Sequence, residues 1–342
     1  MPSFLTHYTF AKEVVKDCKE GLEQLIFIGT QGPDFFFSLD ADGISLESTE
    51  EQKAVSKFGA DLHDKDIAHI YPYFVQYAID HPEEKEVVLT YLDGLLMHYC
   101  LDSSAHPYII SIAGWVIPET APNIYYGGHG FIETFIDMIV SKEHKTWKHK
   151  LTRYLKIDNK EHLKIISKAY DYVNSMTLKN PYIKEDTYFR CVESLYDLEN
   201  RCQYPRLKTE REVNKYWNTK RGIVILHYPV FIKKFYKNLD FLNKSHSPWK
   251  DLLTGEERRE SFYDFFSLAK EKYQVTHELV KNATSKEEFE EKLAAFTKGI
   301  NHAGWLETDP AKVITSSPIW PDGYDPFGNI IKDVDNNELY RR

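Results

Sequence analysis

The chain has 342 residues, of which 28% are charged and 14% aromatic, a composition typical of a globular protein with a full core rather than a disordered one. Its net charge of −9 disfavours a protein that binds nucleic acid through non-specific electrostatic attraction. No apolar run is long enough to cross a bilayer, and the first residues lack the basic and apolar segments of a secretory signal. We therefore expect a cytoplasmic protein without a transmembrane segment. Four scattered cysteines agree with a reducing compartment.

The N-terminal segment predicts one helix followed by a tight turn. Apolar residues recur at helical spacing after Thr6, so we expect Thr6 to cap this helix and His7 to lie in its first turn. Gly32 and Pro33 then predict a fixed turn, in which Asp34 is either a turn cap or an inward-facing ligand. The three phenylalanines after Asp34 favour its burial, and a buried carboxylate needs a partner.

A polar loop over 38–50 precedes the next predicted helix. Ser48 and Glu51 have the spacing of a capping box, and the helix that they begin carries His63. Acidic residues surround His63, which is usually the mark of a solvated helix turn. The adjacent pair His63 and Asp64 also matches the HD signature of a class of phosphohydrolases.

The densest group of candidate ligands lies on a long helix that we expect to begin near 81–87. His98, Asp102 and His106 follow one another at four-residue intervals and so share one helix face. Asp102 lies between the two imidazoles and can face two metal positions at once. We expect Pro107 to end this helix, because proline lacks the N–H that continues the hydrogen-bond ladder.

His129 and Glu133 repeat the four-residue spacing on the next predicted helix. Imidazoles and carboxylates without thiolates form the ligand set of catalytic zinc and related hydrolytic metals. The apolar segment 107–128 before them is interpreted as a buried connection. The alternative is a lid beside the metals, with aromatic side chains that meet the substrate: Trp115, Tyr125 and Tyr126.

The second half of the chain predicts more helices without clustered ligands. We expect helices after caps at Thr254 and Ser285, a helix rather than a strand over 222–232, and a loop-like tail from Gly304. We divide the chain into a metal-binding core, 1–150, and a helical C-terminal region, 151–342, packed on it. The remaining histidines are predicted to be structural: His227, His246, His277 and His302.

Eight residues together resemble the ligand order of the zinc-dependent phospholipase C family, whose fold is similar to that of the single-strand-specific S1/P1 nucleases. The matching segments are THYTFA, QGPDFFF, DLHD, HYCLDSSAH and HGFIE, all within 1–150. The resemblance implies an all-α fold, a multi-helix bundle with a metal cleft. The eight residues are His7, Asp34, His63, His98, Asp102, His106, His129 and Glu133.

The resemblance also implies three zinc ions and a division of the ligands among them. Asp34, His63 and His98 would hold one ion, and Asp102 would bridge it to a second ion that also takes His7. The third ion would be held by His106, His129 and Glu133. Asp34 and Asp102 would be the catalytic carboxylates, and metal-activated hydroxide would cleave a phospholipid or related phosphodiester, with peripheral membrane contact.

Two features depart from the family pattern. Secreted members use the amine of an N-terminal Trp as a ligand, and here the amine of Pro2 would take that place after methionine removal. The separation between Asp34 and His63 is also longer, so Asp61 or Asp64 are alternative ligands.

Three other functions compete with the phospholipase interpretation. The same trinuclear scaffold serves single-strand nucleases and nucleotidases. An HD-type phosphohydrolase would use His63 and Asp64 but leave the ligands on the central helix unexplained. A non-catalytic binding protein would keep zinc for stability, since a bound ion stabilises the state that holds it.

Overall fold

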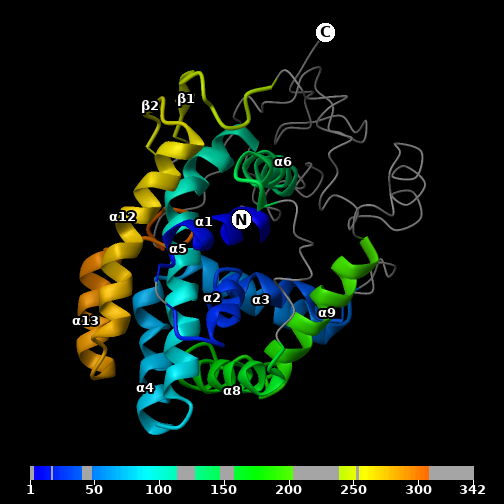
Figure 1. Ribbon diagram of the computed structural model, residues 1–342, viewed down its shortest axis with the longest axis vertical. Helices are drawn as coiled ribbons and strands as arrows, with labels where there is room; N and C mark the ends of the chain where they lie inside the picture. The colour runs from blue at the N-terminus through cyan, green and yellow to red at the C-terminus, as the bar shows by residue number, and fades with distance from the viewer. Residues whose placement is uncertain are drawn as a thin grey trace.

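The computed structural model describes residues 4–16, 18–40, 48–113, 128–146, 158–202, 239–251 and 254–307. This part of the chain is predominantly helical, as predicted, with one small antiparallel sheet (Figure 1). Pro2 and the segment 222–232 lie outside the described residues, as does most of the segment 107–128, so the predictions made for them stay predictions. The elements are α1 (Phe4–Val14), α2 (Glu23–Gly29), η1 (Gly32–Ser38), α3 (Glu50–Asp64), η2 (Ile67–His69), α4 (Pro72–Asp80), α5 (Lys85–Ala113), α6 (Gly128–Glu143), α8 (Lys160–Met176), α9 (Thr187–Cys202), β1 (Trp249–Lys250), β2 (Glu257–Arg258), α12 (Phe262–Lys281) and α13 (Lys286–Thr297).

The helix α5 is the centre of the fold, and the other helices are arranged around it (Figure 1). Nearly all of its residues from Val87 onward are buried, so it is enclosed on all sides by other elements. The helix α2 crosses it closely because Gly29 meets Gly94 there. A Cβ atom on Gly94 would lie 2.4 Å from the carbonyl oxygen of Ile26.

The prediction that Pro107 ends this helix is wrong, because α5 continues to Ala113 with Pro107 inside it. Proline removes one helical hydrogen bond, here the one to the carbonyl of Ser103. The residues after it, including Tyr108 and Ile109, are buried in the core. Their packing outweighs the loss of one hydrogen bond, so the helix is extended past the ligand face.

Two predicted helix starts are displaced, and one is confirmed. The capping box of α3 is formed by Thr49 and Gln52, one residue after the predicted pair. Thr254 caps no helix; the cap of α12 is Ser261, whose side chain accepts from the N–H of Asp264. Ser285 caps α13 as predicted.

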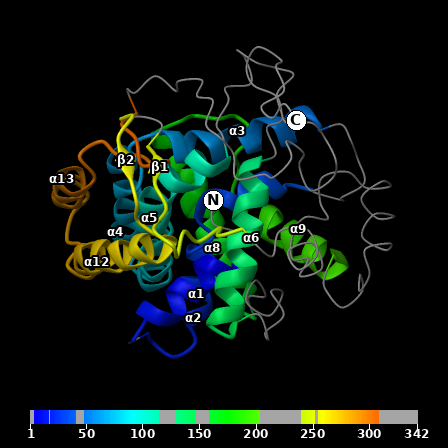
Figure 2. The same ribbon diagram turned by 90° about the horizontal axis from the view of Figure 1, so that it is seen from above.

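Thr6 lies inside α1 rather than at its cap. The first N–H groups of α1 are instead bonded by the carboxylate of Asp137 in α6, which accepts from Leu5 at 3.0 Å and from Thr6. Asp137 is fully buried, and a carboxylate is favoured at a helix N-terminus because it compensates the unbonded N–H groups there. This contact holds α1 and α6 side by side (Figure 2).

The described helices from the second half of the chain pack directly on those of the first half. The helix α8 contacts α4 and α5, and α12 lies along α5. Three buried tyrosines, Tyr91, Tyr170 and Tyr188, join α5, α8 and α9 through hydroxyl–hydroxyl bonds of 2.8 Å. Among the described helices we find none with the length and apolarity needed to cross a bilayer.

Candidate metal centre

The fold brings the eight predicted ligands together from five elements. The helix α1 contributes His7, η1 contributes Asp34 and α3 contributes His63, while α5 and α6 contribute the rest. The side chains of this set, all buried except the partly exposed His63 and His129, form three groups that could hold a metal ion, with the ligand atoms of each group within 4.8 Å of one another. The groups are His7, Asp34 and His98; His63, His98 and Asp102; and His106, His129 and Glu133.

Asp102 belongs to the second group and also faces His7 of the first. One of its oxygens is 3.2 Å from Nε2 of His7, and the other is 3.1 Å from Nε2 of His98. Asp34 places an oxygen 3.1 Å from Nε2 of His63 and 3.9 Å from that of His98. Ligand atoms that each lie about 2.0–2.2 Å from a tetrahedral zinc ion are about 3.3 Å apart. The separations between these carboxylate oxygens and imidazole nitrogens therefore fit the binding of a zinc ion.

The third group is formed where α5 faces α6. Nε2 of His129 lies 2.8 Å from a Glu133 oxygen, and Nε2 of His106 lies 3.5 Å from the same oxygen. His106 is also close to Asp102, with 3.9 Å between Nδ1 and the carboxylate. The ligand set predicted for the third ion thus coincides with one of the three groups. The other two groups share His98 and divide their ligands differently from the prediction, because Asp34 is grouped with His7 and Asp102 with His63.

The alternatives considered for Asp34 lie elsewhere. Asp61 forms an ion pair with Lys57, 2.7 Å away on the exposed side of α3. Asp64 belongs to none of the three groups. His63 faces Asp34 rather than its neighbour Asp64, an arrangement unlike the adjacent ligands of an HD site.

Three of the imidazoles are oriented by backbone carbonyls. Nδ1 of His63 bonds the carbonyl of Gly59 at 2.7 Å, and Nδ1 of His98 bonds that of Thr30 at 3.0 Å. Because a carbonyl only accepts, each Nδ1 carries the proton, and Nε2 offers its lone pair to the cluster. His106 is held in the same way, at 2.7 Å, by the carbonyl of His302. Metal-binding histidines are typically fixed by such a bond.

Several buried polar atoms in the cluster make no hydrogen bond of good geometry to the described residues. These atoms are Oδ1 of Asp34, both carboxylate oxygens of Asp102, both ring nitrogens of His7 and Nε2 of His106. Buried polar groups in native proteins nearly always have a partner, and a histidine cluster with only a structural role would satisfy them internally. Bound metal ions would satisfy the carboxylate oxygens and one nitrogen of each imidazole.

The electrostatics of the cluster suit metal binding. Burial lowers the pKa of His106 to about 3 and that of His129 well below its usual value, so both imidazoles are neutral. Burial alone would raise the pKa of Asp102, but His98, whose own pKa is raised by Asp102 and Asp34, outweighs it and lowers the pKa of Asp102. This carboxylate is therefore ionised, and a metal ion would take the place of the proton on His98. Neutral imidazoles and ionised carboxylates are the forms that bind a metal.

A scan of protein-family models, a search of curated proteins and a search of solved structures each found no match. The geometry of the chain itself is therefore the basis for assigning its function.

Two residues near the cluster were missed by the sequence analysis. His302, predicted to be an isolated structural histidine, is fully buried against the cluster, with its ring centroid 4.9 Å from that of His63. No spacing in the sequence connects these two residues. Asp137 did carry a signal, because it continues the four-residue spacing of His129 and Glu133 along α6.

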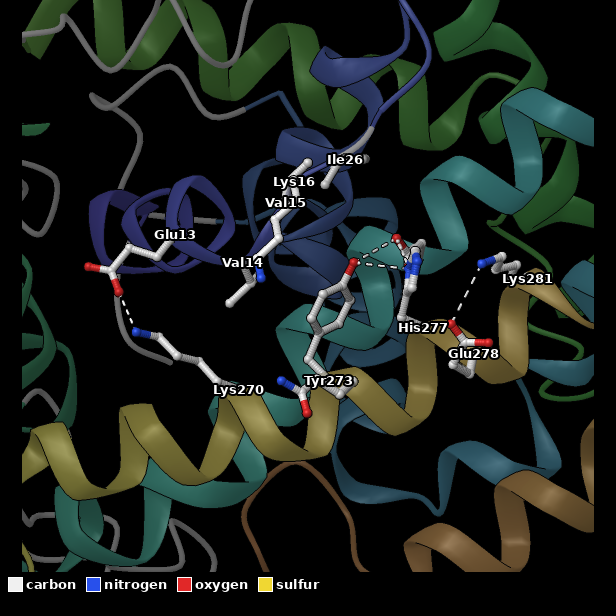
Figure 3. A pocket seen from close by; sticks show the side chains of 12 residues that line it. Glu13, Val14, Val15, Lys16, Ile26, Lys270, Tyr273, His277, Glu278 and Lys281 are labelled. Atoms are coloured by element: carbon white, nitrogen blue, oxygen red, sulfur yellow. Dashed lines mark hydrogen bonds and ion pairs between the residues drawn. The ribbon is translucent and has the colours of Figure 1, made fainter.

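A separate cavity of about 540 Å³ lies between α1, α5 and α12, and none of the eight cluster residues lines it (Figure 3). Asp93 is buried in its wall and accepts from the hydroxyl of Tyr273 at 2.9 Å. Nδ1 of His277 lies 3.1 Å from both oxygens of Asp93. The prediction that His277 is structural agrees with this pairing.

The pair of Asp93 and His277 predicts a pH dependence of stability. The hydrogen bond to Asp93 raises the pKa of His277 above 6.5, so its stabilising effect is full below pH 6.5 and is lost as pH rises through the folded-state value. We expect the His277→Gln variant to show a smaller decrease in Tm between pH 6 and pH 9 than the parent protein. Thermal unfolding across this pH range tests it, and equal decreases would contradict it.

Proposed function

We propose that this protein is a zinc-dependent phosphodiester hydrolase of the phospholipase C type. The observation that carries the proposal is the set of three ligand groups drawn from α1, η1, α3, α5 and α6, together with the carboxylate of Asp102, whose two oxygens face His7 and His98. Chance burial of polar residues does not explain why three imidazoles are each fixed by a carbonyl with Nε2 directed toward carboxylates.

Zinc is the ion that these ligands favour. The three groups contain five imidazoles and three carboxylates and no thiolate. Calcium and magnesium take oxygen ligands almost exclusively, whereas imidazole suits zinc and related transition metals. A structural zinc site would be built with cysteine, and the buried Cys100 and Cys191 belong to none of these groups.

The charge of the site supports an anionic substrate. Three divalent ions would carry six positive charges, which the carboxylates of Asp34, Asp102 and Glu133 would only half neutralise, because the imidazoles are neutral ligands. The remaining positive charge attracts a phosphodiester and stabilises the additional negative charge of its transition state. A neutral amide or ester would gain less from it.

When bound, zinc lowers the pKa of a coordinated water and polarises phosphoryl oxygens. The residues of the chain would position the ions that supply this chemistry. Asp102 and Asp34, the carboxylates predicted to be catalytic, hold the spacing between the imidazoles on α1, α3 and α5. In the reaction, the oxygen of water bonds to phosphorus, the bond from phosphorus to the leaving alcohol oxygen breaks, and a proton passes to that oxygen.

An exposed aromatic side chain beside the cluster supports a substrate with an apolar part. Phe37 is 43% exposed, and its ring stacks on that of His63, with centroids 5.8 Å apart. His63 is itself partly exposed, unlike the fully buried His98. We infer that Phe37 lies where a substrate reaches the metals, and that it contacts an acyl chain.

We expect Phe37→Ala to raise KM about 5- to 30-fold for a long-chain phospholipid, the effect of losing about 1–2 kcal/mol of apolar contact. The kcat for a small water-soluble phosphodiester should change little, because that substrate has no apolar chain. Leu268→Ala is the matched control, since Leu268 is similarly exposed, at 41%, but lies on α12. Steady-state kinetics on both substrates check this, and equal effects of the two variants would refute it.

The proposed function is tested by metal content and turnover on the same sample. Elemental mass spectrometry of the untagged protein should find about three zinc ions per chain, the number that the resemblance to the phospholipase C family implies. Hydrolysis of a chromogenic phosphodiester should stop on treatment with a chelator and return on addition of zinc. Zinc without turnover on phospholipid vesicles or single-stranded DNA would indicate a binding protein, whereas preference for DNA would indicate a nuclease.

A further inference from the structure

The segment 298–307, the His302 loop, joins α3 and α5, which carry half of the cluster residues. The N–H of His302 donates to the carbonyl of His63 at 3.2 Å, at the end of α3. On α5, the hydroxyl of Tyr99 donates to the carbonyl of Ile300 at 2.8 Å. The loop is thus bonded to α3 and to α5, although it follows Glu133, the last of the eight ligands, by nearly half of the chain.

The backbone of the loop determines the tautomer and the orientation of one ligand, His106. The carbonyl of His302 accepts from Nδ1 of His106 at 2.7 Å. This bond places the proton of His106 on Nδ1 and leaves Nε2 toward Glu133, 3.5 Å away. Loss of such a bond allows the imidazole to rotate or to change tautomer, and either change weakens metal binding.

The His302 side chain supports two other ligands. Its ring is fully buried, with its centroid 4.9 Å from that of His63 and 5.4 Å from that of His98. Nε2 lies 3.2 Å from the hydroxyl of Tyr71, and the ring stands edge-on to Tyr99. Because Tyr71 and Tyr99 also contact this imidazole, its ring is fixed in position where it packs against the rings of His63 and His98.

A glycine, Gly304, allows the loop to approach α5 closely beside His106. Gly304 has φ of +79°, and a Cβ there would lie 2.7 Å from Cγ of Pro107 and 2.9 Å from the carbonyl oxygen of Ser103. That carbonyl is the one that Pro107 cannot bond. The close approach therefore occurs at the turn of α5 that carries Asp102 and His106.

We propose that the His302 loop is part of the metal centre, in which His302 is a positioning residue for His106, His63 and His98. The proposal rests on the proposed zinc site and deepens it, because it assigns control of zinc affinity to a segment outside the eight ligands. His302 acts through these ligands and is not itself assigned to zinc or substrate.

The first test compares two glycines of the same loop. Gly299 also has φ of +79°, but a Cβ there meets only the Leu306 side chain, at 3.4 Å. Gly299→Ala and Gly304→Ala therefore introduce the same backbone strain, and only Gly304→Ala displaces the loop from α5. Competition with a chromogenic chelator should show zinc bound about 10- to 100-fold more weakly by Gly304→Ala, with Gly299→Ala within about twofold of the parent on the same scale.

The second test changes the His302 side chain in place. His302→Phe keeps a ring of similar size but loses the hydrogen bond to Tyr71, whereas His302→Ala removes the ring that packs against His63 and His98. We expect zinc affinity to fall in the order parent, His302→Phe, His302→Ala, and the visible spectrum of the cobalt-substituted protein to change in His302→Ala. Circular dichroism of the metal-free proteins establishes which variants fold. If Gly304→Ala does not fold, the zinc affinity of His302→Phe provides the test instead.

The outcomes separate this proposal from the proposed function. Unchanged zinc affinity and cobalt spectrum in folded His302→Ala would overturn the positioning role and leave the zinc hydrolase proposal intact. A parent protein that binds zinc but hydrolyses no phosphodiester would overturn the function alone, since the affinity differences would still be measurable. A parent protein that binds no zinc would overturn both.

Discussion

Asp102→Asn is expected to lower activity at least ~100-fold and to lower the zinc content by about one ion or more per chain. The two oxygens of Asp102 face different imidazoles, His7 at 3.2 Å and His98 at 3.1 Å. Asparagine keeps the shape but has one oxygen and no charge, so it cannot bridge two positions. Zinc content and phosphodiester turnover of the purified variant measure the effect.

The matched control for this variant is Asp93→Asn. Asp93 is also a buried carboxylate of α5, but it faces Tyr273 and His277 rather than the cluster. This change should lower thermal stability without changing zinc content. If Asp102→Asn retained the full zinc content of the parent, the assignment of Asp102 as a bridging ligand would be wrong.

Gly32→Ala is expected to lower zinc content and activity by at least ~10-fold, although Gly32 has no side chain to bind a metal. Its φ is +51°, and a Cβ there would lie 2.8 Å from ring atoms of His98. The added methyl group would push this imidazole off the position that the Thr30 carbonyl gives it. The turn before Asp34 would shift at the same time.

Gly21→Ala separates this displacement from backbone strain. Gly21 has φ of +85° and nothing within 4 Å of the added Cβ, so its replacement introduces strain alone. That strain costs about 1–2 kcal/mol of stability, and we expect it to leave zinc content unchanged. Equal zinc content in Gly32→Ala and Gly21→Ala would show that Gly32 does not position His98.

The elements that carry the ligands were predictable because their patterns are local. His98, Asp102 and His106 share a face of any helix through that segment, so their proximity follows from spacing alone. Asp34 was predicted in a fixed turn, and the structure places it in η1 beside His63. The polar spacing of α6 likewise anticipated the pair of His129 and Glu133.

The features that were missed depend on contacts between distant segments. Pro107 was expected to end α5, but the packing of the residues beyond it decides otherwise. Thr6 matches a helix cap locally, yet the first N–H groups of α1 are bonded by Asp137 from α6. His302 gives no periodic signal at all, because it reaches the cluster through the packing of α12 and α13 around α5 and α4.

The origin of the ligands along the chain has a consequence for chain entropy. An ion held by His7 and Asp102 would close a loop that spans more than a quarter of the chain, whereas one held by His106 and His129 would close a much shorter loop. Closing a loop costs entropy that grows slowly with length, by about 0.6 kcal/mol for each doubling. The first ion would thus act as a long cross-link that restrains α1, while the other would act as a local staple between α5 and α6.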